Sequence, residues 1–375
     1  MYKIKGKRKE KSIMSIMKRL GFLAAFLIPL TTWLDVMLLQ NYWLTVAFVF
    51  ILVPLLDELV GRDPENVSEA AVLRLSEERY FRHVLLTWTV FQFGFLSWAA
   101  LHVAGRTNWE ALDFIGFTLS VALSTGGVGI TAAHELGHKR TRVEQWAAQG
   151  LLMTVGYMHF FIEHNLGHHV WVATPHDPAT ARHGQSVYSF WRQSVFGGWR
   201  SAWRLEKQRL QRSRKALWSL NNRMILYSIL PLGFLTGLLG LTVLATGTFS
   251  MLVVVFWLGQ AVLAFTLLEI VNYLEHYGIR RREIAPMRYE RVNPKHSWNA
   301  NHLVSNLLLF QLQRHSDHHA HSGRRYQVLR HMEESPQLPF GYPLMILIAL
   351  VPSLWFGYMH PRLQAWKNSS IEKVA

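Results

Sequence analysis

Histidines gather in four short motifs of this 375-residue chain, which holds 19 histidines in all. The motifs are HELGHK at 134–139, EHNLGHH at 163–169, NYLEHYG at 272–278 and LQRHSDHHA at 312–320. Together they supply nine imidazoles: His134, His138, His164, His168, His169, His276, His315, His318 and His319. Neutral imidazole is the commonest metal ligand in proteins, so the motifs predict a metal site.

The spacing within the motifs predicts how the histidines share metal ions. Residues four apart stack on one face of an α-helix, so we expect His134 and His138 to hold one ion, and His164 and His168 likewise. His169 and His319 each follow another candidate ligand directly and point about 100° away from it on a helix. Adjacent pairs can therefore reach two metals. Nine imidazoles are too many for one ion and suit two.

The chain contains no cysteine, which excludes thiolate catalysis, Cys-ligated zinc, iron–sulfur clusters and a built-in rubredoxin. Catalytic zinc sites use at most three histidines. Nine histidines therefore favour two redox metals that keep open coordination positions. For oxygen chemistry, iron is the preferred choice. Four acids adjoin the motif histidines, and we expect them to accept hydrogen bonds from the free ring nitrogens of other ligands: Glu135, Glu163, Glu275 and Asp317.

The elements that must position these histidines are membrane helices. Apolar residues make up 50% of the chain and charged residues 17%, against about 25% charge in an average soluble protein. Six apolar spans are near the ~20 residues that cross a bilayer: 21–39, 43–60, 84–104, 111–133, 224–245 and 250–271. Short connections at 40–42, 105–110 and 246–249 pair them into three hairpins. The stretches 147–162 and 342–357 are expected to lie at the interface.

We therefore predict an all-α polytopic membrane protein with six transmembrane helices and a cytoplasmic, histidine-rich di-iron region, forming one domain over residues 1–375. Its expected parts are a basic N-terminus (1–20), four spans (21–133), a histidine region (134–223), two spans (224–271), and a second histidine region with the tail (272–375). Of the 39 lysines and arginines, all but Arg106 flank the spans on one side. The positive-inside rule assigns that side to the cytoplasm. Attraction to anionic headgroups explains part of the net charge of +15, and nucleic-acid binding is disfavoured because no separate basic domain exists.

The four motifs resemble those of the membrane alkane 1-monooxygenases, or alkane omega-hydroxylases, an integral-membrane non-haem di-iron family, and the resemblance covers nearly the whole chain. HELGHK is shared loosely with desaturases and xylene-type monooxygenases, whereas NYLEHYG and LQRHSDHHA are more specific. The one departure is Ile279, where the family usually has Leu or Met, and it is conservative.

The resemblance implies terminal hydroxylation of medium- to long-chain n-alkanes to 1-alkanols with O2, two electrons and two protons. It also implies two iron ions bound by the nine motif histidines, with no further catalytic residue and no other cofactor. Reduced rubredoxin would supply the electrons, and a rubredoxin reductase using NADH or NADPH would reduce it. The alkane would come from the bilayer of the bacterial inner (cytoplasmic) membrane, with the N-terminus and the metal site in the cytoplasm.

If the chain is such a hydroxylase, we expect one set of residues to bind the electron donor and another to limit substrate length. An acidic donor is expected to dock on a basic face made by Arg200, Arg204, Lys207, Arg209, Arg212, Arg214, Lys215 and the run 280–282. Substrate length is expected to depend on a stripe of the second span, Val46, Val49 or Phe50, and Val53. Val49 either lines an apolar channel or faces lipid or a neighbouring helix.

Three alternatives remain open. A related membrane di-iron hydroxylase or desaturase would act on another apolar chain. An intramembrane zinc protease would use His134, His138 and a third ligand, with Glu135 as base, but it leaves six motif histidines unexplained. A haem-binding electron carrier would need histidines facing each other within the membrane. Metal analysis and an optical spectrum separate the di-iron, zinc and haem readings.

Overall fold

A computed structural model of the chain describes residues 14–372, without the side chains of 369–372. Residues 1–13 of the expected basic N-terminus and 373–375 of the tail lie outside the described residues. The described part is mostly helical, as predicted. Its strands, β1 (Glu283–Ala285) and β2 (Arg288–Tyr289), pair as a small antiparallel hairpin.

Within residues 14–372, five helices are long and apolar enough to cross a membrane, and they coincide with five of the six predicted spans. They cover Ile16–Leu39, Arg79–Gly105, Ala111–Gly137, Arg223–Thr246 and Met251–His276. The first consists of α1 (Ile16–Gly21), the 3-10 turn η1 (Phe22–Phe26), α2 (Leu27–Leu34) and the π-turn η2 (Asp35–Leu39). The third consists of α7 (Ala111–Ala122), the π-helix η4 (Leu123–Ile130) and α8 (Thr131–Gly137). The other three are α6 (Arg79–Gly105), α13 (Arg223–Thr246) and α14 (Met251–His276).

The remaining predicted span, 43–60, is also helical but shorter. It consists of α3 (Leu44–Ala47), the π-turn η3 (Phe48–Leu52) and α4 (Val53–Val60). Seventeen residues rise about 26 Å, slightly less than the ~30 Å hydrocarbon core. Because α3 packs against α2, this helix returns beside the first span and closes the first predicted hairpin.

A bent pair of helices covers the C-terminal apolar stretch. The helices α17 (Tyr342–Ala349) and α18 (Pro352–Glu372) are together long and apolar enough for a span, but the chain bends by 118° between them. The bend falls at Pro352, where proline interrupts the backbone hydrogen bonding of a helix.

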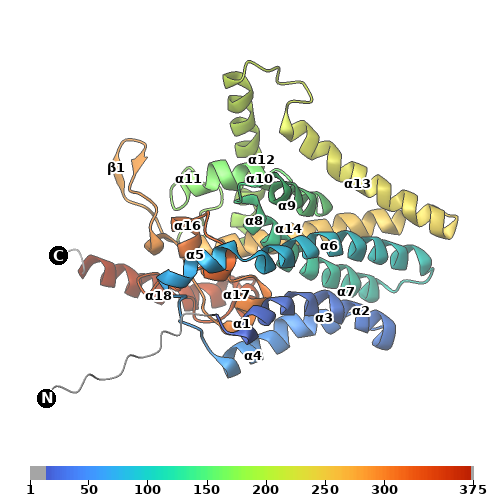
Figure 1. Cartoon of the computed structure of the whole chain (residues 1–375), viewed down its shortest axis with the longest axis horizontal. Coiled ribbons are helices and arrows are strands. Elements are labelled where there is room, and N and C mark those ends of the chain that lie inside the picture. The colour runs from blue at the N-terminus through green and yellow to red at the C-terminus, as the bar shows by residue number, and fades with distance from the viewer. Residues whose placement is uncertain (1–13, 373–375) are drawn as a thin grey trace.

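The motifs lie together at one end of the helix bundle (Figure 1). The short connections between paired spans lie at the other end, on the right in Figure 1. The long helix α12 (Val187–Arg212) projects from the bundle, and α13 returns along a diverging path (Figure 1). The shorter elements at the histidine end are α5 (Glu69–Glu77), α9 (Arg142–Thr154), α10 (Phe160–Glu163), η5 (His164–His168), α11 (His169–Trp171), η6 (Pro294–His296), α15 (Leu303–Leu308), α16 (His315–Ala320) and η7 (Tyr326–Val328).

A close helix contact holds the two central histidine-bearing helices in register. A Cβ atom added to Gly126 in η4 would lie 2.6 Å from the Cα of Ala264 in α14. Only glycine permits that approach. The contact therefore sets the relative position of α8, which carries His134, and of α14, which carries His276.

Candidate metal centre

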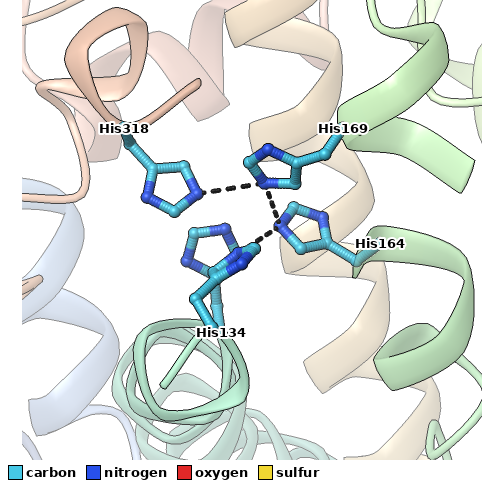
Figure 2. A group of neighbouring side chains, drawn as sticks. His134, His164, His169 and His318 are labelled. Atoms are coloured by element: carbon cyan, nitrogen blue, oxygen red, sulfur yellow. Dashed lines mark hydrogen bonds between the residues drawn. The ribbon is translucent and has the colours of Figure 1, made fainter. Parts of the chain in front are cut away.

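The nine motif histidines converge into two groups. One group contains His134, His138, His164, His169 and His318, and the other contains His168, His276, His315 and His319. In each group, one ring nitrogen from every histidine lies within 4.8 Å of all the others. Figure 2 shows His134, His164, His169 and His318 with their rings turned toward one another from different segments of the chain.

The distances within the groups suit metal ions better than hydrogen bonds. The Nε2 of His164 faces both the Nε2 of His138, at 3.1 Å, and the Nε2 of His169, at 3.0 Å. In the second group the Nε2 of His319 likewise faces two others, His168 at 3.2 Å and His315 at 2.9 Å. A ring nitrogen has one proton or one lone pair, so it cannot satisfy two such neighbours. Nitrogens bound at about 2.1 Å to an octahedral ion would lie about 3.0 Å apart when adjacent and about 4.2 Å when opposite.

Burial supports the same reading. Neither ring nitrogen of His134 has a hydrogen-bond partner among the described residues, although the side chain is buried. Burial also lowers the pKa of His164, His169 and His318 well below the usual range. These imidazoles are therefore neutral, which is the form that binds a metal.

A π-turn explains why one predicted pair is divided. His164 and His168 were expected to share an ion, and this is wrong, because they belong to different groups. The turn at His164–His168 is a π-turn, in which the N–H of His169 donates to the carbonyl of His164. In such a turn the residue that returns to the same face is five positions on. His169 consequently joins His164.

The other predicted pairs have the expected grouping in the structure. His134 and His138, four apart on α8 and its end, share the first group. The adjacent residues His168 and His169 fall into different groups, and so do His318 and His319. The arrangement therefore brings together all nine predicted residues and divides them between two centres.

Asp177 was missed by sequence reasoning and contacts a candidate ligand directly. Its Oδ2 lies 2.9 Å from the Nδ1 of His168 and accepts a hydrogen bond from the hydroxyl of Thr180 at 2.6 Å. Burial lowers the pKa of His168, but the carboxylates of Asp177, Glu163 and Glu269 together outweigh burial and raise that pKa above its ordinary value. The only sequence signal was an acid nine residues beyond His168, in a segment without motif spacing.

The four motif acids do not play the expected part, since none of them bonds the Nδ1 of a candidate ligand within the described residues. Glu135 pairs with Lys139 at 2.8 Å. Asp317 accepts two hydrogen bonds from Arg324, at 2.6 and 2.7 Å. Burial raises the pKa of Glu163 to about 8, and its Oε1 has no hydrogen-bond partner in the described part of the chain.

Glu275 is the motif acid that contacts a candidate ligand, but it contacts the Nε2 of the His315 ring and not the Nδ1. Its Oε2 lies 3.1 Å from the Nε2 of His315, and its Oε1 accepts a hydrogen bond from the hydroxyl of Tyr342 at 2.7 Å. The carboxylate therefore lies beside His315, on the side of the ring that faces the other histidines of the second group.

An apolar cavity reaches the first group at His134. Its walls come from the first two helical spans, η4, α14, α15 and α17. Val49, Phe50 and Val53 of the predicted stripe line it, whereas Val46 is not among its lining residues. The cavity suits an apolar chain, because apolar burial is proportional to area and needs no directional partner.

A cationic cleft adjoins the second group through Asp177. Its lining includes Arg182, Arg192, Arg200, Arg204 and Arg280, and it also includes Asp177, the partner of His168. Three residues of the predicted basic face, Arg200, Arg204 and Arg280, therefore line one cleft. Arg209 instead forms an ion pair with Glu206 at 2.6 Å.

Comparisons with known proteins agree with this site. Residues 107–349 match the fatty acid desaturase family model. The chain is 44% identical to alkane 1-monooxygenase 2 of Pseudomonas aeruginosa, over 93% of each protein. It is 42% identical to alkane 1-monooxygenase 2 of Alcanivorax borkumensis, over 96% of this chain and 95% of the relative.

A more distant relative has a different substrate in its name. The hydroxylase component of the xylene/toluene monooxygenase of Pseudomonas putida is 31% identical over 68% of this chain and 66% of its own length. Together with the spanning helices, these relatives identify a multi-pass membrane protein.

Proposed function

Since the chain belongs to the alkane 1-monooxygenase family of fatty-acid-desaturase-type membrane enzymes, we propose that it hydroxylates the terminal methyl group of medium- to long-chain n-alkanes. One observation carries the proposal: nine histidines form two groups that could each hold a metal ion, and an apolar cavity reaches the first of these groups at His134.

Each histidine group would hold one iron ion. The first iron would bind His134, His138, His164, His169 and His318, and the second would bind His168, His276, His315 and His319. Bound iron would supply activation of dioxygen, which takes up two electrons and two protons as the alkane becomes a primary alcohol and water. Asp177 keeps a proton on the Nδ1 of His168 and leaves its Nε2 free to bind.

The cavity walls would select and orient the substrate. An alkane partitions into the bilayer and offers no polar group for recognition, so only the length and shape of the cavity can discriminate between homologues. Apolar walls such as Val49 and Leu268 also exclude water from the space beside His134. A chain end placed there presents its methyl group to the first histidine group.

The electron donor would dock at the cationic cleft. Rubredoxin, reduced by a reductase that uses NADH or NADPH, is the donor that we propose. Arginines such as Arg200 and Arg204 would attract an acidic partner. A donor bound over the cleft would lie next to Asp177, one hydrogen bond away from the metal ligand His168.

The charge distribution supports an orientation. The arginines of the cationic cleft lie beside the second histidine group, and the positive-inside rule would place that end of the bundle in the cytoplasm. A soluble donor could reach it there. We propose the bacterial inner membrane as the location.

The test combines metal analysis with a product assay. The purified chain should contain two irons and show no Soret band, and with rubredoxin, its reductase and NADH it should convert alkanes of a C6–C20 ladder to 1-alkanols. One zinc with peptidase activity would instead identify a protease, and a Soret band would identify a haem carrier. Turnover of xylene without turnover of any alkane would support the related hydroxylase reading, which the 31% identical relative suggests.

A further inference from the structure

A small internal cavity touches one candidate ligand from each histidine group. His164 of the first group and His168 of the second both line it. Buried polar side chains also line it, among them Ser194, Glu269 and Asn272. The cavity has room for about one water molecule, and polar cavities of that size hold ordered water. It therefore offers a hydrated space beside both candidate metal centres.

Glu269 of α14 is an acid of this cavity that is bonded to no candidate ligand. It is 3% exposed and lies seven residues before His276, the nearest ligand on its helix. Its Oε1 accepts a hydrogen bond from the Tyr157 hydroxyl at 2.8 Å. Its Oε2 accepts one from the Ser194 hydroxyl and another from the Asn272 amide at 3.2 Å. Because these partners are neutral, the carboxyl can take up and release a proton without breaking an ion pair.

The cavity adjoins the cationic cleft at α12. Consecutive residues of that helix line the two spaces, Gln193 the cleft and Ser194 the cavity. Pro178 lines both, and its carbonyl accepts a hydrogen bond from the Gln193 side chain at 2.9 Å. The Ser201 side chain, in the cleft, interacts with the Glu163 carboxylate, in the cavity. Polar side chains therefore connect the cavity to the solvent in the cleft.

The apolar cavity on the other side of the site offers no such connection. Among the described residues, no acid lines it. It reaches the histidine groups at His134 and touches neither His164 nor His168. Protons move along groups that both donate and accept hydrogen bonds, and aliphatic walls supply none. The two protons that the proposed hydroxylation consumes therefore need a different entrance from that of the alkane.

We propose that Glu269 relays protons from the cationic cleft to the two histidine groups through water in the small cavity. The need for protons rests on the proposed function, in which an alkane, O2, two electrons and two protons give an alkanol and water. For each proton, the Glu269 carboxyl receives one from the cleft side and passes one through the cavity water to the oxygen that is being reduced. The carboxyl thus returns to its starting state, and the electrons come separately from the donor.

The first measurement needs no turnover. A cryo-EM map of the iron-loaded full chain in lipid nanodiscs should show water in the cavity, within hydrogen-bonding distance of Glu269. Glu269→Gln has nearly the same size and keeps polar atoms, so the water should remain in this variant. A dry cavity in the wild type would overturn the relay.

The second measurement follows O2 consumption and 1-alkanol formation together, in H2O and in D2O, with donor and alkane saturating. Glutamine cannot take up and release a proton, so Glu269→Gln should slow both rates by a factor on the order of 100. Its solvent isotope effect should exceed that of the wild type, because proton delivery becomes rate-limiting. Glu269→Asp restores a carboxyl and should recover most of the lost rate.

Two variants separate a relay from a structural role. Asp35→Asn is the matched control, because Asp35 is also a buried acid of a spanning helix. Its carboxylate holds the connection at the opposite end of the bundle, where it accepts a hydrogen bond from the Leu44 N–H at 2.7 Å. Tyr157→Phe removes one bond to Glu269 and leaves the acid in place. Both variants should keep the wild-type solvent isotope effect, and Tyr157→Phe should be much faster than Glu269→Gln.

Melting temperature and iron content show that each variant is folded and loaded. If Glu269→Gln keeps the wild-type rate and isotope effect while the chain hydroxylates alkanes, the relay is wrong and the proposed function stands. A wild-type chain that consumes O2 without forming alkanol would refute the proposed function, and a larger isotope effect in its Glu269→Gln variant would still support the relay. Equal losses in Tyr157→Phe and Glu269→Gln, without a change in isotope effect, would reduce Glu269 to a structural tie.

Discussion

The Nδ1 of His168 lies 2.9 Å from the Oδ2 of Asp177, and both side chains are buried. This contact fixes the proton on the outer ring nitrogen and turns Nε2 toward His276, His315 and His319. Because Asp177 also lines the cationic cleft, it connects the surface of the protein to a candidate iron ligand.

Asp177→Asn should therefore weaken metal binding at the second group. Loss of a carboxylate that orients a histidine ligand reduces metal affinity or activity about 10- to 100-fold. Iron retained after dialysis against a chelator measures the effect, and turnover should fall with it. Asp113→Asn is the control, since it breaks a surface pair with Arg106 at the opposite end of the bundle. Equal iron retention in the two variants would contradict the assigned role of Asp177.

His276→Ala tests the nine-ligand assignment at the motif that contributes a single histidine. A methyl group cannot replace a metal–imidazole bond, so the variant should lose iron from the second group and nearly all hydroxylation. His83→Ala, an exposed histidine outside both groups, should retain both within about twofold. If His276→Ala keeps two irons and full activity, the division into five and four ligands is wrong. The same loss is expected when any other histidine of the two groups is replaced.

The sequence predicted the membrane helices and the nine histidines because both depend on local patterns. Five long apolar runs became spanning-length helices, and helical spacing placed His134 with His138 and divided His318 from His319. These outcomes follow from hydropathy and from 3.6 residues per turn, which any α-helix obeys.

The partner of His164 and the role of Asp177 could not be predicted in the same way. A π-turn has no local composition that distinguishes EHNLGHH from an α-helical segment, yet it moves the partner of His164 from His168 to His169. Asp177 lies outside regular helices, where chain direction depends on tertiary contacts. The roles of Glu135 and Asp317 were mispredicted because cations just beyond their own helices, Lys139 and Arg324, pair with these carboxylates.

Donor docking should depend on salt, provided that rubredoxin limits turnover. The cationic cleft should steer an acidic partner mainly through its association rate, which falls as ionic strength rises. Arg200→Glu combined with Arg204→Glu should lower turnover at limiting rubredoxin about tenfold at low salt and flatten the salt dependence. Arg212→Glu with Arg214→Glu makes the same change in net charge at exposed positions outside the cleft, and its effect should be smaller. Equal losses in the two double variants would place the docking surface elsewhere.

Val49 should act as a determinant of chain length. It lies eight residues before Asp57, about 12 Å along the helix, is 9% exposed and lines the apolar cavity beside Phe50. Val49→Trp should fill part of the cavity and shift preference toward shorter alkanes, with iron content unchanged. Ile51→Trp is the matched control, because Ile51 is 61% exposed on the same helix and does not line the cavity. The product profile across the alkane ladder measures the shift. An iron-replete Val49→Trp enzyme with the wild-type profile would show that the alkane lies along a different path from the one through this cavity.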